Sequence, residues 1–588
     1  MRSRWLLLIL LLVLSPAAQG ANPPTIFFTD LISGPNTGGE TVSGYSGAYV
    51  TIYGNNFGAA PTVSWNGLNC LRVVSVNGQQ VNTWMWYQKV VVQFGSACTA
   101  GAGTLQVTAG GQSSICADVG NLGNHCRFTV RSGHIYFVAK NGSDNANGSF
   151  SAPWATVLKA RNTMVAGDST YAQDGVSQTS DDGSGWNTYF LIDSQQGTAG
   201  SPLALVAYPG ATVTIGTTTL ANEIGIRSKG SSGGGQSHWV FAGLTVRAHD
   251  NAVNPWGDSD WRIVGNDLSC PNGDGQNGCL EATLWTNSVF LGNNVHDAGA
   301  TGASDQYHGV YPSTDSNHLE LAWGTIANVN GCRGIQIHSS PNGAGTGNNQ
   351  FDISIHDNVI HDTQCDGIVL ATVDPSKGPI LVYNNIIYNA GKANTPEGGG
   401  AWFCVNSPGY TNTGTPGSGS VEVFNNTMYN CGPNPSPSYS GSSGGVGNGG
   451  NNANLQVHIR NNIIYQLNGG ACAQTPCAPY WLNGSSNAQG IYGDNNIMFG
   501  IGAPPASSVV TGTINLDPGF VSASTPDFHL SASSSPAIGA GDTNTPASAY
   551  DHDGLTRSTP PSIGAYEFTA GTAVVRPLPP TGLTVVVF

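Results

Sequence analysis

The sequence predicts an all-β protein in which a parallel β-solenoid follows a small β-sandwich. Three observations lead to this fold class. A pattern of apolar strand residues followed by Asn recurs through the second half of the chain, short strands of alternating polarity occupy the first hundred residues, and only 9% of the 588 residues are charged. Soluble proteins are usually about 25% charged, so this composition excludes long surface helices with many ion pairs and charge-rich disordered chains.

Residues 1–20 have the layout of a secretory signal peptide. Arg2 and Arg4 precede the apolar run Trp5–Leu14, and small residues follow up to Gly20. No later stretch reaches the ~18 apolar residues that a membrane helix needs, so we expect a secreted protein without membrane insertion. Without Arg2 and Arg4, 17 of the 19 basic residues remain against 34 acidic ones. This negative charge repels phosphate backbones and argues against nucleic acid as a partner.

The 12 cysteines indicate disulfides and not a metal site. The sequence contains no Cys-x-x-Cys pair, the spacing typical of zinc sites, and an exported chain in an oxidising compartment tends to pair its thiols. Short separations along the chain predict four disulfides: Cys70–Cys98, Cys116–Cys126, Cys270–Cys279 and Cys472–Cys477.

Residues 21–131 are predicted to form the β-sandwich. Tyr49–Tyr53 alternates in polarity, a turn follows at Gly54–Gly58, and a second strand begins at Thr62–Trp65. This run resembles the immunoglobulin-like IPT/TIG domain of extracellular proteins, and the resemblance implies a spacer or a binding module. The tryptophans of this segment are expected in its core and not as sugar platforms: Trp65, Trp84 and Trp86.

The internal repeat defines the solenoid, which we expect to span residues 132–515. Copies such as Ile353–Ile360 and Ile380–Ile387 each contain a strand, an Asn turn and a second strand. The same Asn recurs at 266, 293, 358, 385, 426, 462 and 496. Equivalent side chains of stacked coils lie ~4.8 Å apart, so these amides are predicted to form a structural hydrogen-bonded ladder. An internal aromatic stack is expected from the aligned residues His296, His361, Tyr388, Tyr429, Tyr465 and Phe499.

Both ends of the solenoid carry recognisable segments. His134–Val138 and the turns after it resemble the first coil of right-handed parallel β-helix domains, in which a short helix, here Thr156–Val165, caps the open end. Residues 516–568 resemble the closing module found after bacterial extracellular β-helices, with a salt-bridged turn expected around Arg557. Residues 569–588 are predicted to be a linker or tail.

A second set of aligned strands places polar residues on one outer face of the solenoid. The strands are Cys279–Trp285, Tyr307–Ser313, Cys332–His338 and Cys365–Leu370. Because side chains alternate along a strand, Tyr311, Gln336 and His338 are predicted to point outward. His308, Arg333 and Asp366 are predicted to stack where three neighbouring strands begin.

The same alignment predicts one more disulfide. Cys332 and Cys365 occupy one register on successive coils. The ~4.8 Å between coils lies within the Cα separation that a disulfide allows. We therefore expect a bond between these two cysteines across one rung.

Residues 134–568, with these strands and Asn turns, resemble the pectate-lyase-like superfamily, whose members cleave or modify polysaccharides on that face of the helix. The resemblance implies a catalytic group in which Arg333 neutralises a uronate carboxylate, His308 or His338 removes the C5 proton, and Tyr311 donates a proton to the leaving oxygen. Asp305 could orient His308 or bind a cation, for which Ca²⁺ is the candidate. Candidate substrate-binding residues are Gln336, Asp366, Trp285 and Trp402.

Three functions remain open at this point. A lyase acting on a uronic-acid polysaccharide leads, although no Lys base lies between Lys229 and Lys377. A non-catalytic adhesin, polysaccharide-binding or matrix protein is the alternative, favoured by the low charge and by Gly-, Asn- and Ser-rich loops. A glycoside hydrolase is third, because the paired carboxylates that such enzymes require do not stand out in the sequence.

Overall fold

The fold is described from a computed structural model of the chain. The description covers residues 22–568 except 78–83, 118–121, 123–124, 220–222, 231–234, 340–348, 393–401, 410–416, 433–443, 449–451, 453, 468–481, 485–489, 501–509 and 545–547. The predicted signal peptide, the predicted tail and the pair Cys472–Cys477 lie outside the described residues.

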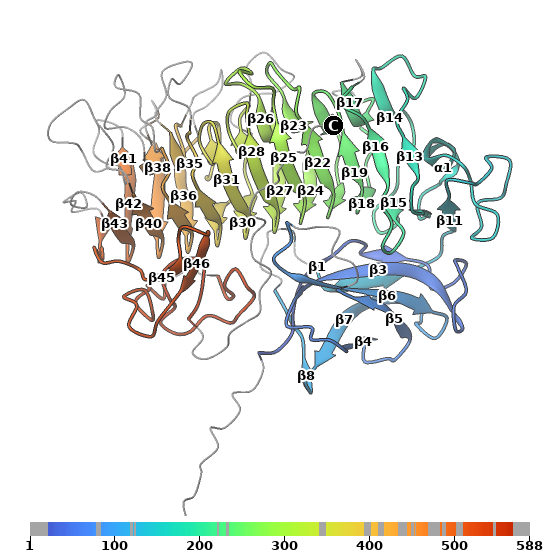
Figure 1. Ribbon diagram of the computed structural model, residues 1–588, viewed down its shortest axis with the longest axis horizontal. Helices are drawn as coiled ribbons and strands as arrows, with labels where there is room; N and C mark the ends of the chain where they lie inside the picture. The colour runs from blue at the N-terminus through green and yellow to red at the C-terminus, as the bar shows by residue number, and fades with distance from the viewer. Residues whose placement is uncertain are drawn as a thin grey trace, which may run out of the picture.

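The structure is all-β and has the predicted architecture, a right-handed parallel β-helix preceded by a small β-sandwich. In Figure 1 the solenoid runs across the top, with the sandwich below its N-terminal half and the segment of β45 and β46 below its C-terminal half. Each coil contributes one strand to each of three parallel sheets, here called sheets 1, 2 and 3 in the order in which the chain passes through them.

Sheet 1 faces the sandwich, and its described strands in order are β11 (Ile135–Val138), β12 (Ser169–Ala172), β15 (Leu203–Ala207), β18 (Trp239–Ala242), β21 (Arg262–Val264), β24 (Thr286–Leu291), β27 (Asn317–Ala322), β30 (Ile353–His356), β33 (Ile380–Tyr383), β36 (Gly419–Phe424), β39 (Leu455–Arg460), β42 (Ile491–Asp494) and β44 (Val510–Thr511). Sheet 2 follows the Asn turns, with β13 (Ser177–Gln178), β16 (Thr214–Gly216), β19 (Thr245–Arg247), β22 (Asp267–Cys270), β25 (Asn294–Ala298), β28 (Thr325–Val329), β31 (Val359–Thr363), β34 (Ile386–Tyr388), β37 (Thr427–Tyr429), β40 (Ile463–Gln466) and β43 (Ile497–Gly500).

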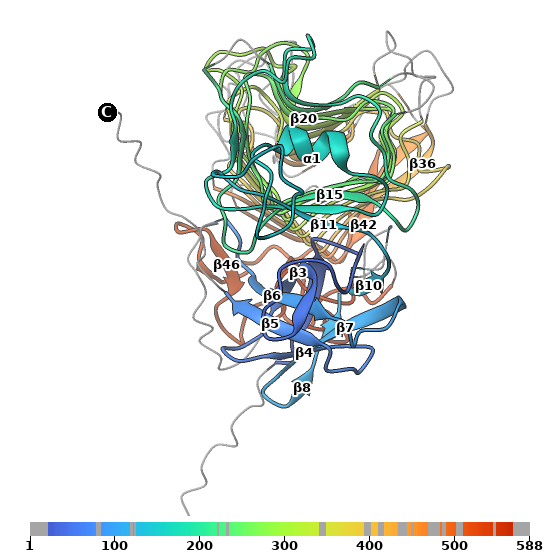
Figure 2. The same cartoon turned by 90° about the vertical axis from the view of Figure 1, so that its right-hand side faces the viewer.

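Sheet 3 lies on the side of the solenoid away from the sandwich. In Figure 2, β20 of sheet 3 is at the top of the solenoid and β3 of the sandwich is below the solenoid. Its described strands are β14 (Thr188–Ile192), β17 (Ile224–Ser228), β20 (Asn251–Asn254), β23 (Gly278–Thr283), β26 (His308–Ser313), β29 (Ile335–Ile337), β32 (Ile368–Leu370), β35 (Phe403–Asn406), β38 (Gly444–Asn448) and β41 (Leu482–Gly484). The first coil is capped by α1 (Val157–Thr163), whose N-cap Thr156 accepts a hydrogen bond from the backbone of Lys159.

The sandwich packs two sheets whose strands end at β10, just before the solenoid begins. One sheet contains β1 (Thr25–Thr29), β3 (Tyr45–Asn55), β5 (Leu71–Val76), β6 (Gln88–Gly95) and β9 (Ile115–Cys116). The other contains β2 (Ser33–Gly34), β4 (Thr62–Trp65), β7 (Gly101–Ala109), β8 (Gln112–Ser113) and β10 (Arg127–Val130). Trp65 is 1% exposed in its core, as predicted, whereas the Trp86 ring stacks on His552 at 4.4 Å, against the closing module.

The predicted Asn ladder is confirmed and sets the turn between sheets 1 and 2. Where the next coil also has an Asn, the amide nitrogen donates to its amide oxygen, at 3.0 Å from Asn266 to Asn293 and 3.1 Å from Asn358 to Asn385. The bonds continue to Asn426, Asn462 and Asn496, each at 3.0 Å. One coil has Gly324 at this place, and its backbone nitrogen donates to Asn358 Oδ1 instead.

Five disulfides join cysteines of the described residues. Four of them are predicted pairs, Cys70–Cys98, Cys116–Cys126, Cys270–Cys279 and Cys332–Cys365. The Cα atoms of Cys332 and Cys365 lie 4.7 Å apart, which is the separation of successive coils. The fifth pair, Cys404–Cys431, was not predicted. Cys404 lies on β35 of sheet 3, whereas Cys431 follows β37 of sheet 2 on the next coil, so the two cysteines do not occupy one register.

The prediction of an internal aromatic stack was wrong about its location. His361 and Tyr388 do stack, with ring centroids 4.6 Å apart, but on the outer face of sheet 2. There the C-terminal segment with hairpin β45 (Phe520–Ser522) and β46 (Asp527–Leu530) covers the row, and Phe528 lies 5.6 Å from the Tyr388 ring. The expected salt-bridged turn is present, since Arg557 Nη1 lies 3.3 Å from Glu567 Oε1.

The helix content offers no candidate for a membrane span. Within the residues described, no helix is long and apolar enough to cross a membrane.

Candidate active site on the outer face of sheet 3

The outer face of sheet 3 carries a row of polar side chains on successive coils. Parallel pairing aligns Arg227 with Asn254 and aligns Glu281 with Tyr311. Leu280 and Val310, which directly precede Glu281 and Tyr311, point into the core and are fully buried. Alternation along each strand therefore projects one polar side chain per coil away from the core.

This row lines a surface cavity of about 390 Å³. Its lining is Glu223, Ile224, Arg227, Asp250, Asn251, Asn254, Trp256, Gln276, Asn277, Glu281, Thr283, Tyr311, Ser313 and Thr314. Most of these are polar or charged, and they come from β17, β20, β23 and β26 or from the loops beside them. Such a concave polar surface suits a hydrophilic ligand.

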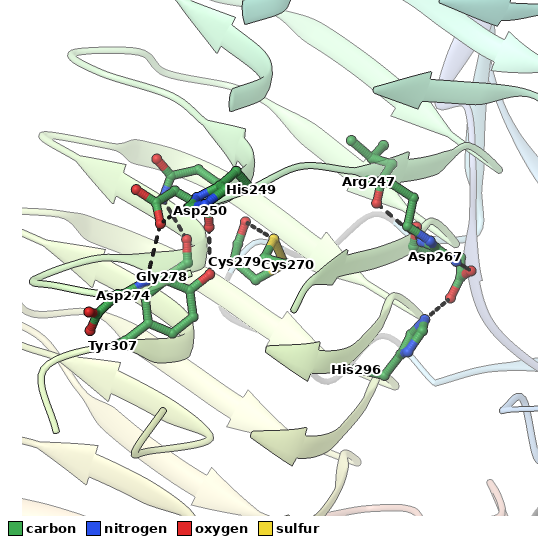
Figure 3. Close-up of a disulfide and its surroundings, with 12 residues drawn as sticks. Arg247, His249, Asp250, Asp267, Cys270, Asp274, Gly278, Cys279, His296 and Tyr307 are labelled. Carbon is green, nitrogen blue, oxygen red and sulfur yellow. Dashed lines mark hydrogen bonds and ion pairs between the residues drawn. A yellow bond between two sulfur atoms is a disulfide. The ribbon is translucent and has the colours of Figure 1, made fainter. Parts of the chain in front are cut away.

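One wall of the cavity is a loop closed by the Cys270–Cys279 disulfide. Gln276 and Asn277 of this loop face the cavity. Figure 3 shows the disulfide with Asp250, Asp274 and Tyr307 beside it, and the Tyr307 hydroxyl donates to the backbone oxygen of Asp250 at 2.5 Å. The disulfide and these bonds fix the wall relative to the strands.

Glu281 is the carboxyl group of this site with a strongly shifted proton affinity. Burial, with a contribution from the negative charge of Asp250, raises the pKa of Glu281 to about 7, and Arg227 opposes both effects. A carboxyl group with a pKa near 7 can take up or release a proton at neutral pH. Glu281 is therefore the best-matched group in the cavity for general acid–base chemistry.

Arg227 is a cation that the protein itself leaves without an ion pair. Among the described residues no carboxylate oxygen lies within 4.0 Å of it, and its Nε has no hydrogen-bond partner. Its guanidinium carbon instead lies 4.9 Å from the centroid of the Trp186 ring. This cation–π contact orients the side chain and leaves its positive charge available to an anionic group.

The structure brings the four predicted catalytic residues together. The Tyr311 hydroxyl lies 3.3 Å from His338 Nδ1, and the rings of Tyr311 and His308 are 5.0 Å apart. Burial raises the pKa of Tyr311 to about 12, and burial with the nearby Arg333 charge lowers the pKa of His338 to about 4. At neutral pH the phenol is thus protonated and the imidazole is neutral.

Two of the four are nevertheless poorly placed to meet a substrate. His308 is only 1% exposed, and burial, with the Arg333 charge, holds its pKa well below the ordinary value. Arg333 Nε lies 3.6 Å from Asp366 Oδ2, and its Nη1 donates to the backbone oxygen of Asp305. Arg333 therefore serves a buried carboxylate and a loop, and of the four predicted residues Tyr311 alone lines the cavity.

The predicted substrate-binding residues do not line the cavity, and they are buried, as is Tyr311 at 7% exposed. Gln336 and Asp366 are 8% and 1% exposed, and Gln336 makes a hydrogen bond that lowers the pKa of the neighbouring Tyr311. Trp402 is 3% exposed and packs against the Cys332–Cys365 disulfide. The expectation that Trp402 stacks under a sugar ring was wrong, because the side chain lies beneath its neighbours.

Trp285 was also assigned to the wrong face. It is fully buried in the solenoid core. β23 ends at Thr283, and Leu284 has a left-handed backbone with φ 52°. That turn breaks the strand alternation, so the next side chain points inward and not outward.

The predicted cation site has no supporting ligand set. The described residues contain no group of three or more His, Cys, Asp or Glu side chains that could hold a metal ion. Ca²⁺ prefers six or more oxygen ligands, with carboxylates among them. Asp305 contributes a backbone oxygen to Arg333, and the residues around it do not fit a Ca²⁺ site.

Sequence reasoning missed the residues that line the cavity beside Tyr311. Glu281 could have been found, because it occupies the outward place of Tyr311 in the aligned strand Cys279–Trp285. Arg227 carried no such signal, since β17 precedes the first recognised copy of the repeat. Trp256 follows β20, forms a β-bridge with Thr283, and lies outside the aligned strands of the repeat.

Comparison with known proteins gives no family for this chain. No protein-family profile matches the sequence, and no curated protein matches it. Pectate lyase Pel9A is similar over 74% of this chain and 97% of its own, with 17% identity and a TM-score of 0.47. A rhamnogalacturonan lyase is similar over 66% and 90%, with 15% identity and a TM-score of 0.34. A GH136 lacto-N-biosidase from Eubacterium ramulus is similar over 65% and 67%, with 12% identity and a TM-score of 0.33.

Proposed function

We propose that this chain is a secreted polysaccharide lyase that cleaves a uronic-acid polymer in the cavity over sheet 3. The observation that carries the proposal is Arg227, a cation without an ion pair, in one cavity with Glu281 and Tyr311. A permanent cation of this kind is suited to bind the carboxylate of a uronate. The five disulfides support an oxidising compartment outside the cell.

The three side chains supply the parts that β-elimination requires. Arg227 pairs with the uronate carboxylate and makes the proton at C5 more acidic. Glu281, in its ionised form, removes that proton while the C4–O bond breaks and a C4–C5 double bond forms. Tyr311, whose pKa of about 12 keeps it protonated, gives its proton to the leaving oxygen.

A glycoside hydrolase is the second candidate, because Asp250 shares the cavity with Glu281. The charge of Asp250 contributes to the raised pKa of Glu281. In hydrolysis a protonated Glu281 would donate to the glycosidic oxygen and an ionised Asp250 would act on the opposite side of the sugar. This mechanism needs no cation and does not explain Arg227.

The products and the pH profile separate the candidates. Pectate, alginate and ulvan, with neutral glycans beside them, are incubated with the protein, and near-ultraviolet absorption and new reducing ends are both followed. A lyase with Glu281 as base gains activity as pH rises through about 7, whereas a hydrolase with Glu281 as acid loses activity over the same range. Unsaturated products support the lyase, and reducing ends without absorption overturn it in favour of the hydrolase.

Variants locate the reaction. Glu281→Gln and Arg227→Ala should each lower turnover on the charged polymer by ~10²–10⁴-fold. Arg127→Ala, an exposed arginine on the sandwich, is the matched control and should keep full activity. Full activity in both cavity variants places the reaction elsewhere, and binding without any product favours the non-catalytic polysaccharide-binding alternative.

A further inference from the structure

Trp256 is the most exposed tryptophan among the described residues. It is 37% exposed and lines the cavity. Trp285 and Trp402, which the sequence had suggested as sugar platforms, are buried. A large apolar ring left open in a polar cavity is an unusual feature, because such rings are normally buried.

The backbone of Trp256 is held by several hydrogen bonds. Its nitrogen lies 2.8 Å from both Ser228 Oγ and Asp258 Oδ2. The residues on either side pair with β23, since Gly257 N donates to Thr283 O at 2.8 Å and Thr283 N donates to Pro255 O at 3.1 Å. The tryptophan is therefore mounted on the edge of the sheet and not on a free loop.

Two glycines, Gly230 and Gly235, have no side chain and so leave room for the segment that contains Trp256 and Asp258. A Cβ on Gly230 would lie 2.2 Å from the backbone oxygen of Trp256, and Gly230 has a left-handed φ of 44°. A Cβ on Gly235 would lie 2.2 Å from Asp258 Oδ1. Asp258 also accepts hydrogen bonds from Ser228 and from the backbone of Gln236. The segment that contains Trp256 and Asp258 is therefore closely packed against Gly230 and Gly235.

Arg227 and Trp256 belong to the lining of one cavity, and their backbones are linked through Ser228. Ser228 follows Arg227 on β17, and its hydroxyl accepts from the Trp256 backbone. The cavity lining therefore contains both a cation and an apolar ring. A uronate presents a carboxylate and an apolar face of C–H groups on one pyranose ring.

We infer that Trp256 is a sugar-binding platform on which the C–H face of a uronate ring stacks while its carboxylate binds Arg227. This inference rests on the proposed function and names the subsite that holds the charged sugar. A ring that is already fixed before binding loses little conformational freedom, so the stacking contributes directly to affinity.

The experiment measures the binding of defined uronate oligosaccharides by calorimetry in the uncleaving Glu281→Gln protein. Adding Trp256→Ala should weaken binding by roughly tenfold or more, and Trp256→Phe should restore most of it, since a ring remains. Phe150→Ala is the matched control, because Phe150 is an exposed aromatic residue at 39% outside the cavity, and it should bind as tightly as the parent.

The outcomes distinguish this inference from the proposed function. Unchanged affinity in Trp256→Ala, with cleavage still dependent on Glu281, overturns the platform and leaves the lyase standing. Tight binding of a neutral oligosaccharide that Trp256→Ala weakens supports the platform and overturns the uronate assignment. If no saccharide in the panel binds the parent protein, both are overturned.

Discussion

The outer faces of sheets 1 and 3 carry similar residues in opposite situations. On sheet 1, Glu320 Oε1 lies 2.9 Å from His125 of the sandwich and 3.0 Å from His356 of the next coil. On sheet 3, neither Glu281 nor Arg227 has an oppositely charged atom within 4.0 Å in the described part of the chain, although the charge of Arg227 lowers the pKa of Glu281. Both carboxyl groups project from a parallel strand in the same way.

The pKa values show what the difference means. Burial alone would raise the pKa of Glu320, but His125 and His356 hold it below its ordinary value. Burial and the charge of Asp250 leave the pKa of Glu281 at about 7, because Arg227 offsets them only in part. The covered face uses its charges to join parts of the molecule, and the uncovered face keeps them available for a ligand. The predictions below test this contrast.

The largest effect is expected from Glu320→Gln. The change leaves His356 and His125 without the buried carboxylate between them, and breaking such a pair costs ~3–5 kcal/mol of unfolding free energy. Chemical denaturation measures the loss. Glu422→Gln is the matched control, because Glu422 pairs with His458 on the same sheet but is partly exposed, and it should cost no more than about 1 kcal/mol. Equal losses would contradict the contrast.

The contribution of the Glu320 cluster should depend on pH. Burial alone would lower the pKa of His356, but Asp357 and Glu320 raise it to about 9. A histidine whose pKa is raised in the folded protein contributes stability that is fully present below about pH 6.5, its ordinary pKa. This contribution is lost as pH rises through about 9. The lowered pKa of Glu320 removes stability as pH falls below its ordinary value of 4.5. The stability difference between wild type and Glu320→Gln should therefore peak between about pH 4.5 and 6.5, and a flat difference would argue against the pairing.

A smaller effect is expected from the turn that joins sheets 1 and 2. Asn385→Leu leaves the Asn358 amide without its acceptor and should cost ~1–3 kcal/mol, with no loss of saccharide binding. Thermal unfolding and calorimetric binding check the two parts. Asn141→Leu, at an exposed Asn outside the ladder, is the comparison and should cost less. Altered binding with unchanged stability would reverse the structural assignment of the ladder.

The smallest effect on stability at pH 5 is expected at the cavity. Glu281→Gln should cost less than about 0.5 kcal/mol at pH 5, because the carboxyl group is protonated there and no ion pair is broken. The folded pKa of about 7 lies above the ordinary 4.5, so wild type loses stability as pH rises between these values, and the variant does not. Denaturation at pH 5 and pH 8 should show the variant gaining relative to wild type at pH 8. A gain at pH 5 only would contradict the pKa direction.

Much of the fold and part of the site could be predicted from the sequence. The Asn repeat gives the coils, and the register of Cys332 and Cys365 gives a disulfide that the structure contains. The same alternation puts Tyr311 on the outer face, where it lines the cavity. It fails at Trp285, because one left-handed residue, Leu284, reverses the direction of the side chain. A strand pattern cannot report such a turn.

The sequence by itself determined the coil, its stacking and the direction of most side chains, because these depend on contacts between equivalent residues of neighbouring repeats. Only the tertiary structure decided which outward faces are covered. His125 contacts Glu320 across 195 residues of sequence, and His552 Nδ1 donates to the backbone oxygen of Asn384 across 168. Such contacts follow no repeat in the sequence, and they alone separate the buried, paired charges of sheet 1 from the open cavity over sheet 3.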